Sequence, residues 1–522
     1  MLKKQKRFTN FAQVQHLFTK HDLNHKMIMA YKKSFRAASL FISAIISTTC
    51  SISAQQISLS KSIRIAQENS FDAQMARYSY LASYWTYRSF QAQLLPAVNI
   101  RGDIANFDHS MVAARNFEDG RVAYVDNNSM SNSLTLSVDQ EIAATGGTVS
   151  LQSYLYRLDQ FTYNEKTYNS QPMRISYTQP LRLYNSLKWE KKTAPVQYEI
   201  AKKTYMSAMQ DIALNATRLY FNVLAAQSTY KQSLSSLSDR EALYEMAQQR
   251  LKLGTTTKSE VLQMELSLIN AKVSVRNDRL ALDNSMYDLF SYLRVTDYEK
   301  AELQAPLAIP DVVINTDIVI QKAIENSSHT QQQKYDMMEA ERSLAQAKAN
   351  RGLQMTLNGQ VGFTQTASTF KSAYTNMRDN EIVGLTLSLP IFDWGVSRGR
   401  VKMAKAQLEV TKTQLEQAHQ DYLEELRRKV TQFNSQPALC REAMRAQEIA
   451  EERYGIMRRR FEAGSISVTD LNTAQQEMEH AKAQYISQLM TFWSDYYSLQ
   501  KSTLYDWMTN SDISVDFDSL VK

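Results

Sequence analysis

A glycine-containing motif occurs twice in this chain. The first copy is "RLKLGTTTKSEVL" at Arg250–Leu262, and the second is "RRRFEAGSISVTDL" at Arg458–Leu471. In both copies a glycine, followed by Ser or Thr, interrupts a stretch rich in helix-forming residues. Glycine tolerates the positive φ of a tight reversal, and Ser or Thr caps the helix that follows. The motif therefore predicts two long helical hairpins that each reverse at a glycine.

The two motifs belong to an internal duplication. Gly254 and Gly464 lie 210 residues apart, whereas "SIRIAQENS" at Ser62–Ser70 and "VIQKAIENS" at Val319–Ser327 lie 257 apart. The offset changes because the first half carries about 47 extra residues, all before the hairpin. The matching segments occur in the same order in both halves, and a single change in offset accounts for their spacing. The sequence therefore predicts two repeats, of which the first contains one insertion.

Each repeat contains a region in which apolar and polar residues alternate with period two. This alternation covers 97–104, 355–363 and 383–389, and the insertion shows it near 134–138 and 149–155. We expect a leader at 1–54, a first repeat at 55–310 (helix, strands 97–181, hairpin 186–295), a second repeat at 311–507 (helix, strands 354–391, hairpin 398–507) and a tail at 508–522.

The hairpin arms are unusually long for a globular protein. From Ser186 to about Lys252 the chain has no glycine and a single proline, and roughly 60 helical residues would span about 90 Å. From Val401 to Phe461 the pattern recurs, and Pro437 and Gly455 are expected kinks or breaks. A soluble coiled-coil bundle would explain such helices. It would not explain the duplicated alternating strands.

The positive charge of the chain is concentrated in its first 54 residues. The whole chain carries +7, residues 1–54 contain nine Lys/Arg and one Asp, and the remainder therefore carries −1. Basic residues ahead of the apolar run at 37–46, with small residues up to Ala54, are typical of a secretory signal. We expect cleavage near Ala54, with lipidation at Cys50 as the weaker alternative and Met1, Met27 or Met29 as the start.

The sequence offers no recognisable catalytic or cofactor site. After cleavage it contains one cysteine, Cys440, and four scattered histidines without metal-ligand spacing. We therefore expect no enzyme activity, no catalytic residues, no metal and no cofactor. A chain that is nearly neutral beyond its leader also predicts no nucleic-acid partner.

Helix, paired strands and a long hairpin, given twice in an exported chain, resemble the TolC-like outer-membrane efflux proteins. The resemblance covers about 57–507 and rests on "LSLPIFDWGVSRGRVKMAKAQLE" at Leu387–Glu409, "LYFNVLAAQ" at Leu219–Gln227 and the two glycine motifs. It implies a mainly α fold with a membrane β-barrel part, in which three chains close one barrel and one helical tunnel. A half-buried soluble sheet would alternate in the same way, but the export signal and the aromatic residues near the strand ends favour a barrel.

The resemblance also implies roles for residues of the glycine motifs. Leu253, Gly254 and Thr255, and likewise Ala463, Gly464 and Ser465, match the turns at the periplasmic tip where an adaptor docks. Glu260 and Asp470 match acidic positions of the pore constriction, where threefold repetition would attract cations. Phe461, Ile466 and Thr473 replace a tyrosine, an arginine and an acid that the family often has there. This puts a closed state held by that polar network in doubt.

The implied function is the outer-membrane channel of a tripartite efflux or type I secretion system. Its partners would be a periplasmic adaptor, an inner-membrane pump of the RND, ABC or MFS type, and outer-membrane lipid. The channel would lie in the outer membrane of a Gram-negative bacterium with its helices in the periplasm, and small molecules or proteins are both candidate substrates. The alternative is an exported structural coiled-coil protein. The insertion leaves the number of barrel strands open.

Overall fold

The computed structural model describes residues 57–115, 120–182, 184–296, 301–306, 309–310, 312–463 and 465–522. The expected leader, with Cys50 and the cleavage point at Ala54, lies outside these residues, and so does Gly464. The elements below all belong to the unit formed by Ile57–Val295 and Leu303–Lys522.

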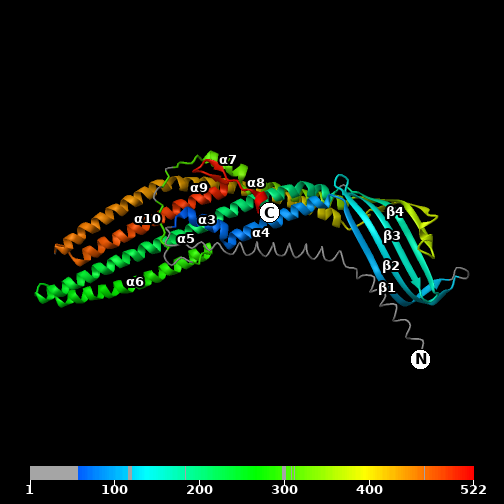
Figure 1. Cartoon of the computed structure of the whole chain (residues 1–522). Coiled ribbons are helices and arrows are strands. Elements are labelled where there is room, and N and C mark those ends of the chain that lie inside the picture. Colours follow the sequence, from blue (N-terminus) through cyan, green and yellow to red (C-terminus); the bar gives the residue numbers. More distant parts are fainter. Residues whose placement is uncertain are drawn as a thin grey trace, which may run out of the picture. The chain divides into compact units, whose positions relative to one another are not determined.

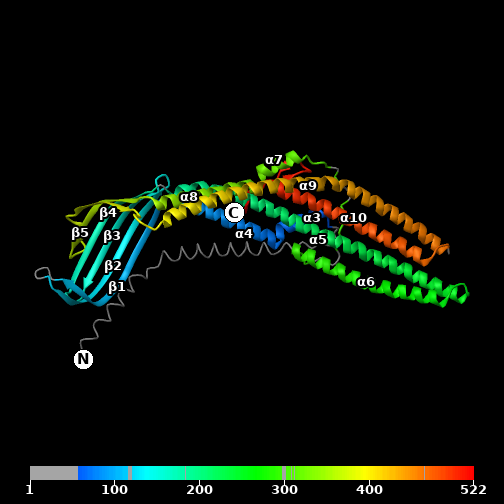
Figure 2. The same cartoon turned by 180° about the vertical axis from the view of Figure 1, so that it is seen from behind.

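The elements occur in the same order in both halves (Figures 1 and 2). The first half consists of α3 (Leu59–Asn69), α4 (Phe71–Gln93), β1 (Ala97–Arg115), β2 (Val122–Ile142), β3 (Gly147–Gln160), β4 (Glu165–Leu181), α5 (Ser186–Lys252) and α6 (Lys258–Leu293). The second half consists of α7 (Thr316–Asn326), α8 (Ser328–Arg351), β5 (Gln354–Ala367), the 3₁₀ helix η1 (Ser372–Tyr374), β6 (Arg378–Ser388), α9 (Val396–Glu462) and α10 (Val468–Thr503). The insertion in the first half therefore corresponds to two additional strands.

Each half opens with two helices, where the sequence predicted one. Ser70 ends α3 and begins α4 with φ −62° and ψ 155°, and Ser327 separates α7 from α8 with φ −71° and ψ 161°. The Ser70 amide donates to the carbonyl of Ala66, and its Oγ accepts from the amide of Ala73 at 3.1 Å. A serine hydroxyl can replace the helical partner of a backbone amide, so it permits a break inside a helical pattern.

The six long strands form one antiparallel meander in the order β1-β2-β3-β4-β5-β6. The pairing places Val98, Val138, Leu151, Ile175 and Val361 opposite one another across β1 to β5. The adjacent row contains Asn99, Ser137, Gln152 and Arg174. Because a shift of one residue would exchange the two faces of a strand, this register gives the sheet one apolar and one polar face.

The apolar face of the sheet is exposed in the single chain. The side chains of Ile100 on β1 and Val383 on β6 are 73% and 81% exposed. All four helix junctions, from α4 into β1, β4 into α5, α8 into β5 and β6 into α9, lie at the same end of the strands. The sheet therefore continues directly into the long helices.

The helices α5 and α9 each run for 67 residues, which corresponds to about 100 Å. Neither is interrupted, so of the kinks or breaks expected at Pro437 and Gly455 the breaks are wrong, and the kinks stay a prediction. Pro437 is buried together with Gln436 and Cys440 in the stretch of α9 that packs on α10, and this packing outweighs the local preference. In the part of the chain that the structure describes, no helix is both long and apolar enough to cross a membrane.

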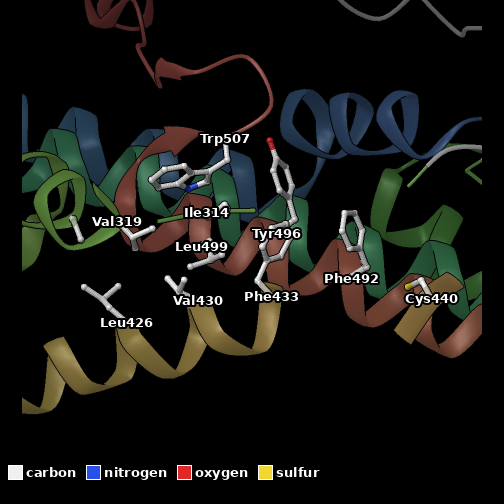
Figure 3. Close-up of a cluster of buried hydrophobic side chains, with 11 residues drawn as sticks. Ile314, Val319, Leu426, Val430, Phe433, Cys440, Phe492, Tyr496, Leu499 and Trp507 are labelled. Carbon is white, nitrogen blue, oxygen red and sulfur yellow. The ribbon is translucent and has the colours of Figure 1, made fainter. Parts of the chain in front are cut away.

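An aromatic and aliphatic core joins α7, α9 and α10 (Figure 3). The rings of Phe433 on α9 and Phe492 on α10 lie 5.4 Å apart, and Tyr496 and Trp507 complete the cluster. The C-terminal residues are ordered against the other helices, where the sequence suggested only a tail. The ring of Phe517, in α11 (Phe517–Val521), packs in a tilted arrangement 5.0 Å from the ring of Tyr80 on α4.

Candidate functional site: the two helix-reversal turns

The α5–α6 turn is built by backbone hydrogen bonds around Gly254. Gly254 has φ +70°, its amide donates to the carbonyl of Leu251 at 3.0 Å, and the amide of Thr255 donates to the carbonyl of Arg250 at 3.0 Å. This pair of hydrogen bonds ends a helix when the residue after its last turn, here Gly254, has a left-handed backbone conformation. An added Cβ would meet nothing within 4 Å, so the backbone conformation alone calls for glycine here.

The α9–α10 turn repeats the same bonds where it is described. The amide of Ser465 donates to the carbonyl of Arg460 at 2.9 Å, and the amide of Ala463 donates to the carbonyl of Arg459 at 3.1 Å. Arg460 and Ser465 lie 210 residues after Arg250 and Thr255. The two turns are therefore structural copies of each other.

A capping box begins the returning helix after each turn. The Thr257 hydroxyl accepts from the Glu260 amide at 3.3 Å while the Glu260 carboxylate accepts from the Thr257 amide. On α10 the Ser467 hydroxyl accepts from the Asp470 amide at 3.2 Å, and the Asp470 carboxylate accepts from the Ser467 amide at 3.1 Å. Both acids satisfy amides that the first helical turn leaves unpaired.

These hydrogen bonds shift the ionisation of both acids. The pKa of Glu260 is held below its usual value by the Thr256 hydroxyl first and the Thr257 amide second. The pKa of Asp470 is held below its usual value by the hydroxyl and then the amide of Ser467. Both carboxylates are exposed and ionised at neutral pH. Each carboxylate accepts hydrogen bonds at the start of its own returning helix. A constriction shared by both acids would therefore need further copies of the chain.

The turn side chains are open to solvent. Leu253 is 77% exposed, and Thr255, Ala463 and Ser465 are exposed as well. An apolar side chain held at the apex of a hairpin, away from any core, is available for contact with a partner. The predicted docking residues of the described turns are therefore accessible.

A polar cluster that the sequence did not predict links the two hairpins near their turns. The carboxylate of Asp239 on α5 accepts from the Tyr454 hydroxyl at 2.7 Å and pairs with the Arg458 guanidinium at 3.1 Å, both on α9. The neighbouring Arg240 donates to Gln475 on α10 at 2.9 Å. Burial, and next the bond to Asp239, raise the pKa of Tyr454, so its hydroxyl stays protonated. A largely buried carboxylate beside a tyrosine and an arginine of another helix cannot be predicted from the spacing of residues in the sequence.

Long paired helices that reverse at capped turns and continue into a sheet with one apolar face are the features expected of an outer-membrane efflux protein. A family model described as outer membrane efflux protein matches residues 62–293 and 319–490. The chain belongs to this family. The resemblance seen in the sequence is thereby confirmed, together with the TolC-like fold.

A curated relative agrees with this membership, and solved structures share the fold. The chain is 24% identical to "Outer membrane protein TolC" of Salmonella enteritidis over 342 residues, which is 62% of this chain and 67% of that protein. The Campylobacter jejuni CmeC outer membrane channel superposes with a TM-score of 0.63 at 15% identity, over 88% of each chain. The outer membrane protein VceC of Vibrio cholerae superposes with a TM-score of 0.60 at 14% identity, over 87% of this chain and 97% of that one.

Proposed function

We propose that three copies of this chain form the outer-membrane channel of a tripartite efflux or type I secretion system. The polar face of the sheet lines the lumen, the apolar face meets lipid, and the long helices extend the passage through the periplasm. An inner-membrane pump supplies the energy and a periplasmic adaptor joins it to the channel. The exported substrates are small molecules or proteins.

One observation carries this proposal. A sheet with one exposed apolar and one polar face passes, within a few residues of β4 and β6, into α5 and α9. In water such an apolar face would stay uncovered, whereas in a membrane it faces hydrocarbon. A sheet that separates lipid from water and continues into helices about 100 Å long is suited to a channel that crosses the outer membrane and extends through the periplasm.

The turns have two roles in this proposal. The exposed residues Leu253, Gly254, Thr255, Ala463 and Ser465 lie at the far end of the helices and dock the adaptor, together with Gly464, which stands between the last two in the sequence. Glu260 and Asp470 gather around the axis when three chains assemble, and their like charges attract cations to the constriction. The signal peptide exports the chain across the inner membrane of a Gram-negative cell, and the mature chain then inserts into the outer membrane.

Fractionation followed by planar-bilayer recording tests the proposal against an exported structural coiled coil. The chain expressed with its leader should be extracted from outer membranes by detergent as a heat-modifiable oligomer, and the purified oligomer should conduct ions. A salt-extractable rod without conductance would support the coiled coil and overturn the channel.

A further inference from the structure

We propose that the inserted β2–β3 hairpin is a permanent part of the membrane wall, and that β1 of one chain pairs with β6 of the next. Each chain then supplies six strands, and three copies close a barrel of eighteen. The number of copies rests on the proposed function. The composition of the wall rests on the sheet itself.

The hairpin occupies an interior position in the sheet. It lies between β1 and β4, pairing with β1 on one side and with β4 on the other. Removing it from the wall would leave β1 and β4 without the partners that satisfy their backbone groups, and unpaired strand edges do not persist in hydrocarbon. The hairpin cannot act as a loop outside the barrel while this sheet persists.

The hairpin turn is also fixed to the helices. The Asn185 side chain, which caps the start of α5, donates to the carbonyl of Ala143 at 2.9 Å, and Gln179 donates to the carbonyl of Thr145 at 2.9 Å. From β2, just before the turn, Gln140 donates to the carbonyl of Leu94 at the end of α4, again at 2.9 Å. These bonds join the inserted turn to the same sheet end from which the long helices leave.

Strand β2 of the hairpin has the faces and length of a membrane segment. Leu134, Leu136 and Val138 of β2 lie on the apolar face, and Thr135 and Ser137 lie on the polar face. Leu134–Ile142, at about 3.4 Å per residue and a tilt of about 40°, spans roughly 23 Å along the membrane normal. Exposed aromatic residues lie near both ends of the sheet, Phe392 and Trp394 beyond β6 and Phe107 with Phe161 at the opposite end. This arrangement matches the aromatic girdles of outer-membrane barrels.

The free edges of the sheet fit a second copy of the chain. The edge strands are β1 and β6, and they run in opposite directions because the meander has six strands. A neighbouring copy therefore continues the antiparallel pattern, with Ile100 of one chain and Leu385 of the next on the same apolar face. Such closure satisfies both edges and removes the exposed backbone groups.

The insertion widens the barrel. At about 4.8 Å between strands and a tilt of about 40°, eighteen strands give a diameter of about 36 Å between backbone centres. Two strands per repeat, as in the second half, would give twelve strands and about 24 Å. Between backbone centres, the barrel is thus roughly 1.5-fold wider than the uninserted repeat would make it.

Disulfide cross-linking in membranes tests the seam. Ile100→Cys is combined in turn with Val383→Cys, Leu385→Cys and Leu387→Cys, and the matched control combines Ile100→Cys with Val361→Cys on the interior strand β5. At least one seam pair should give covalent dimers and trimers on non-reducing gels, because adjacent strands meet disulfide geometry and strands two apart do not. Cross-links confined to monomers, or none in any seam pair while the oligomer stays intact, would overturn the seam.

Cysteine accessibility tests the hairpin. In lipid, Ser137→Cys should react with a charged thiosulfonate about tenfold faster than Leu136→Cys, because the polar face meets water and burial in lipid suppresses the thiolate. Equal reaction rates of the two cysteines would show that the hairpin does not lie in the membrane wall. If the oligomer conducts ions but fails the cross-linking test or the accessibility test, this inference alone is refuted. If no oligomer or no conductance is found, the proposed function is refuted.

Discussion

Tyr454 on α9 donates a 2.7 Å hydrogen bond to the carboxylate of Asp239 on α5 and so joins two hairpins that lie in different halves of the chain. Asp239 is 13% exposed and also pairs with Arg458, which is half exposed. Near the turns, the α5–α6 hairpin is thus held to the α9–α10 hairpin by a largely buried charge with two partners. We expect this link to govern how far the hairpins separate near the tip.

Tyr454→Phe should loosen the distal halves of both hairpins. A hydrogen bond to a charged group contributes about 1.5–3 kcal/mol, and the remaining Arg458 pair compensates part of its loss. Hydrogen exchange of residues 235–252 should therefore accelerate roughly tenfold. Tyr244→Phe, on the same stretch of α5 but outside the cluster, serves as the control. Unchanged exchange in Tyr454→Phe would show that the bond contributes nothing to the link.

Gly254→Ala should destabilise the first turn. A left-handed conformation costs an ordinary residue about 1–2 kcal/mol, and no steric contact adds to this cost. Gly399→Ala, within α9 and equally free of contacts, should instead stabilise its helix by about 0.5–1 kcal/mol. Opposite signs in hydrogen exchange or thermal unfolding would support this account, and equal effects would contradict it. We expect Gly464→Ala to resemble Gly254→Ala.

Leu253→Glu should abolish docking without disturbing assembly. The side chain is 77% exposed at the apex, so its replacement removes no core contact and places a charge where the adaptor would bind. Transport in cells should fall while the oligomer keeps its mass in detergent. Leu251→Glu, an exposed leucine within α5, is the matched control. Full transport by Leu253→Glu would place docking elsewhere.

Asp470→Asn should weaken cation selectivity while leaving trimer stability nearly unchanged. Carboxylates around a narrow axis attract cations, and salt screens this attraction over about 8–10 Å. Glu260→Gln should act similarly in planar-bilayer recordings. Ser467→Ala is the control, because it removes the cap of α10 and keeps the charge. Wild-type selectivity in both single variants and in the double variant would leave these acids as helix caps only.

Acid should loosen the first turns of α6 and α10. Because the pKa values of Glu260 and Asp470 are lowered in the folded chain, the stabilisation from their capping bonds is present at neutral pH. It is lost as the pH falls through those lowered values. Amide protection factors at these turns should be smaller near about pH 3 than at pH 7. The difference should shrink in Glu260→Gln and Asp470→Asn, and an undiminished difference would assign it to other groups.

The parts of the fold that depend on local sequence were predictable. The short stretch from Arg250 to Thr257, with Gly254 within it, contains the residues that predict the end of one helix and the start of the next. Period-two alternation likewise revealed β2 and β3 within the insertion, because apolar and polar faces repeat along a strand. The constriction and docking roles of the turn residues remain predictions.

The parts that depend on packing between distant segments were not predictable. Asp239 meets Tyr454 only after four helices are brought into register, and neither residue stands out in its own helix. Pro437 suggested a break, yet its burial against α10 keeps α9 continuous. Ser70 was recognised as part of the repeat, but serine occurs in helices as well as at their ends, so the break there was missed.

Electron cryo-microscopy of the purified oligomer in lipid nanodiscs would show directly whether three chains form a channel through the membrane. We predict three copies around one axis, a continuous β-wall inside the lipid belt, and a water-filled lumen that leads into a tube formed by α5, α6, α9 and α10. A monomeric particle, or a helical rod with its sheet outside the lipid, would contradict it.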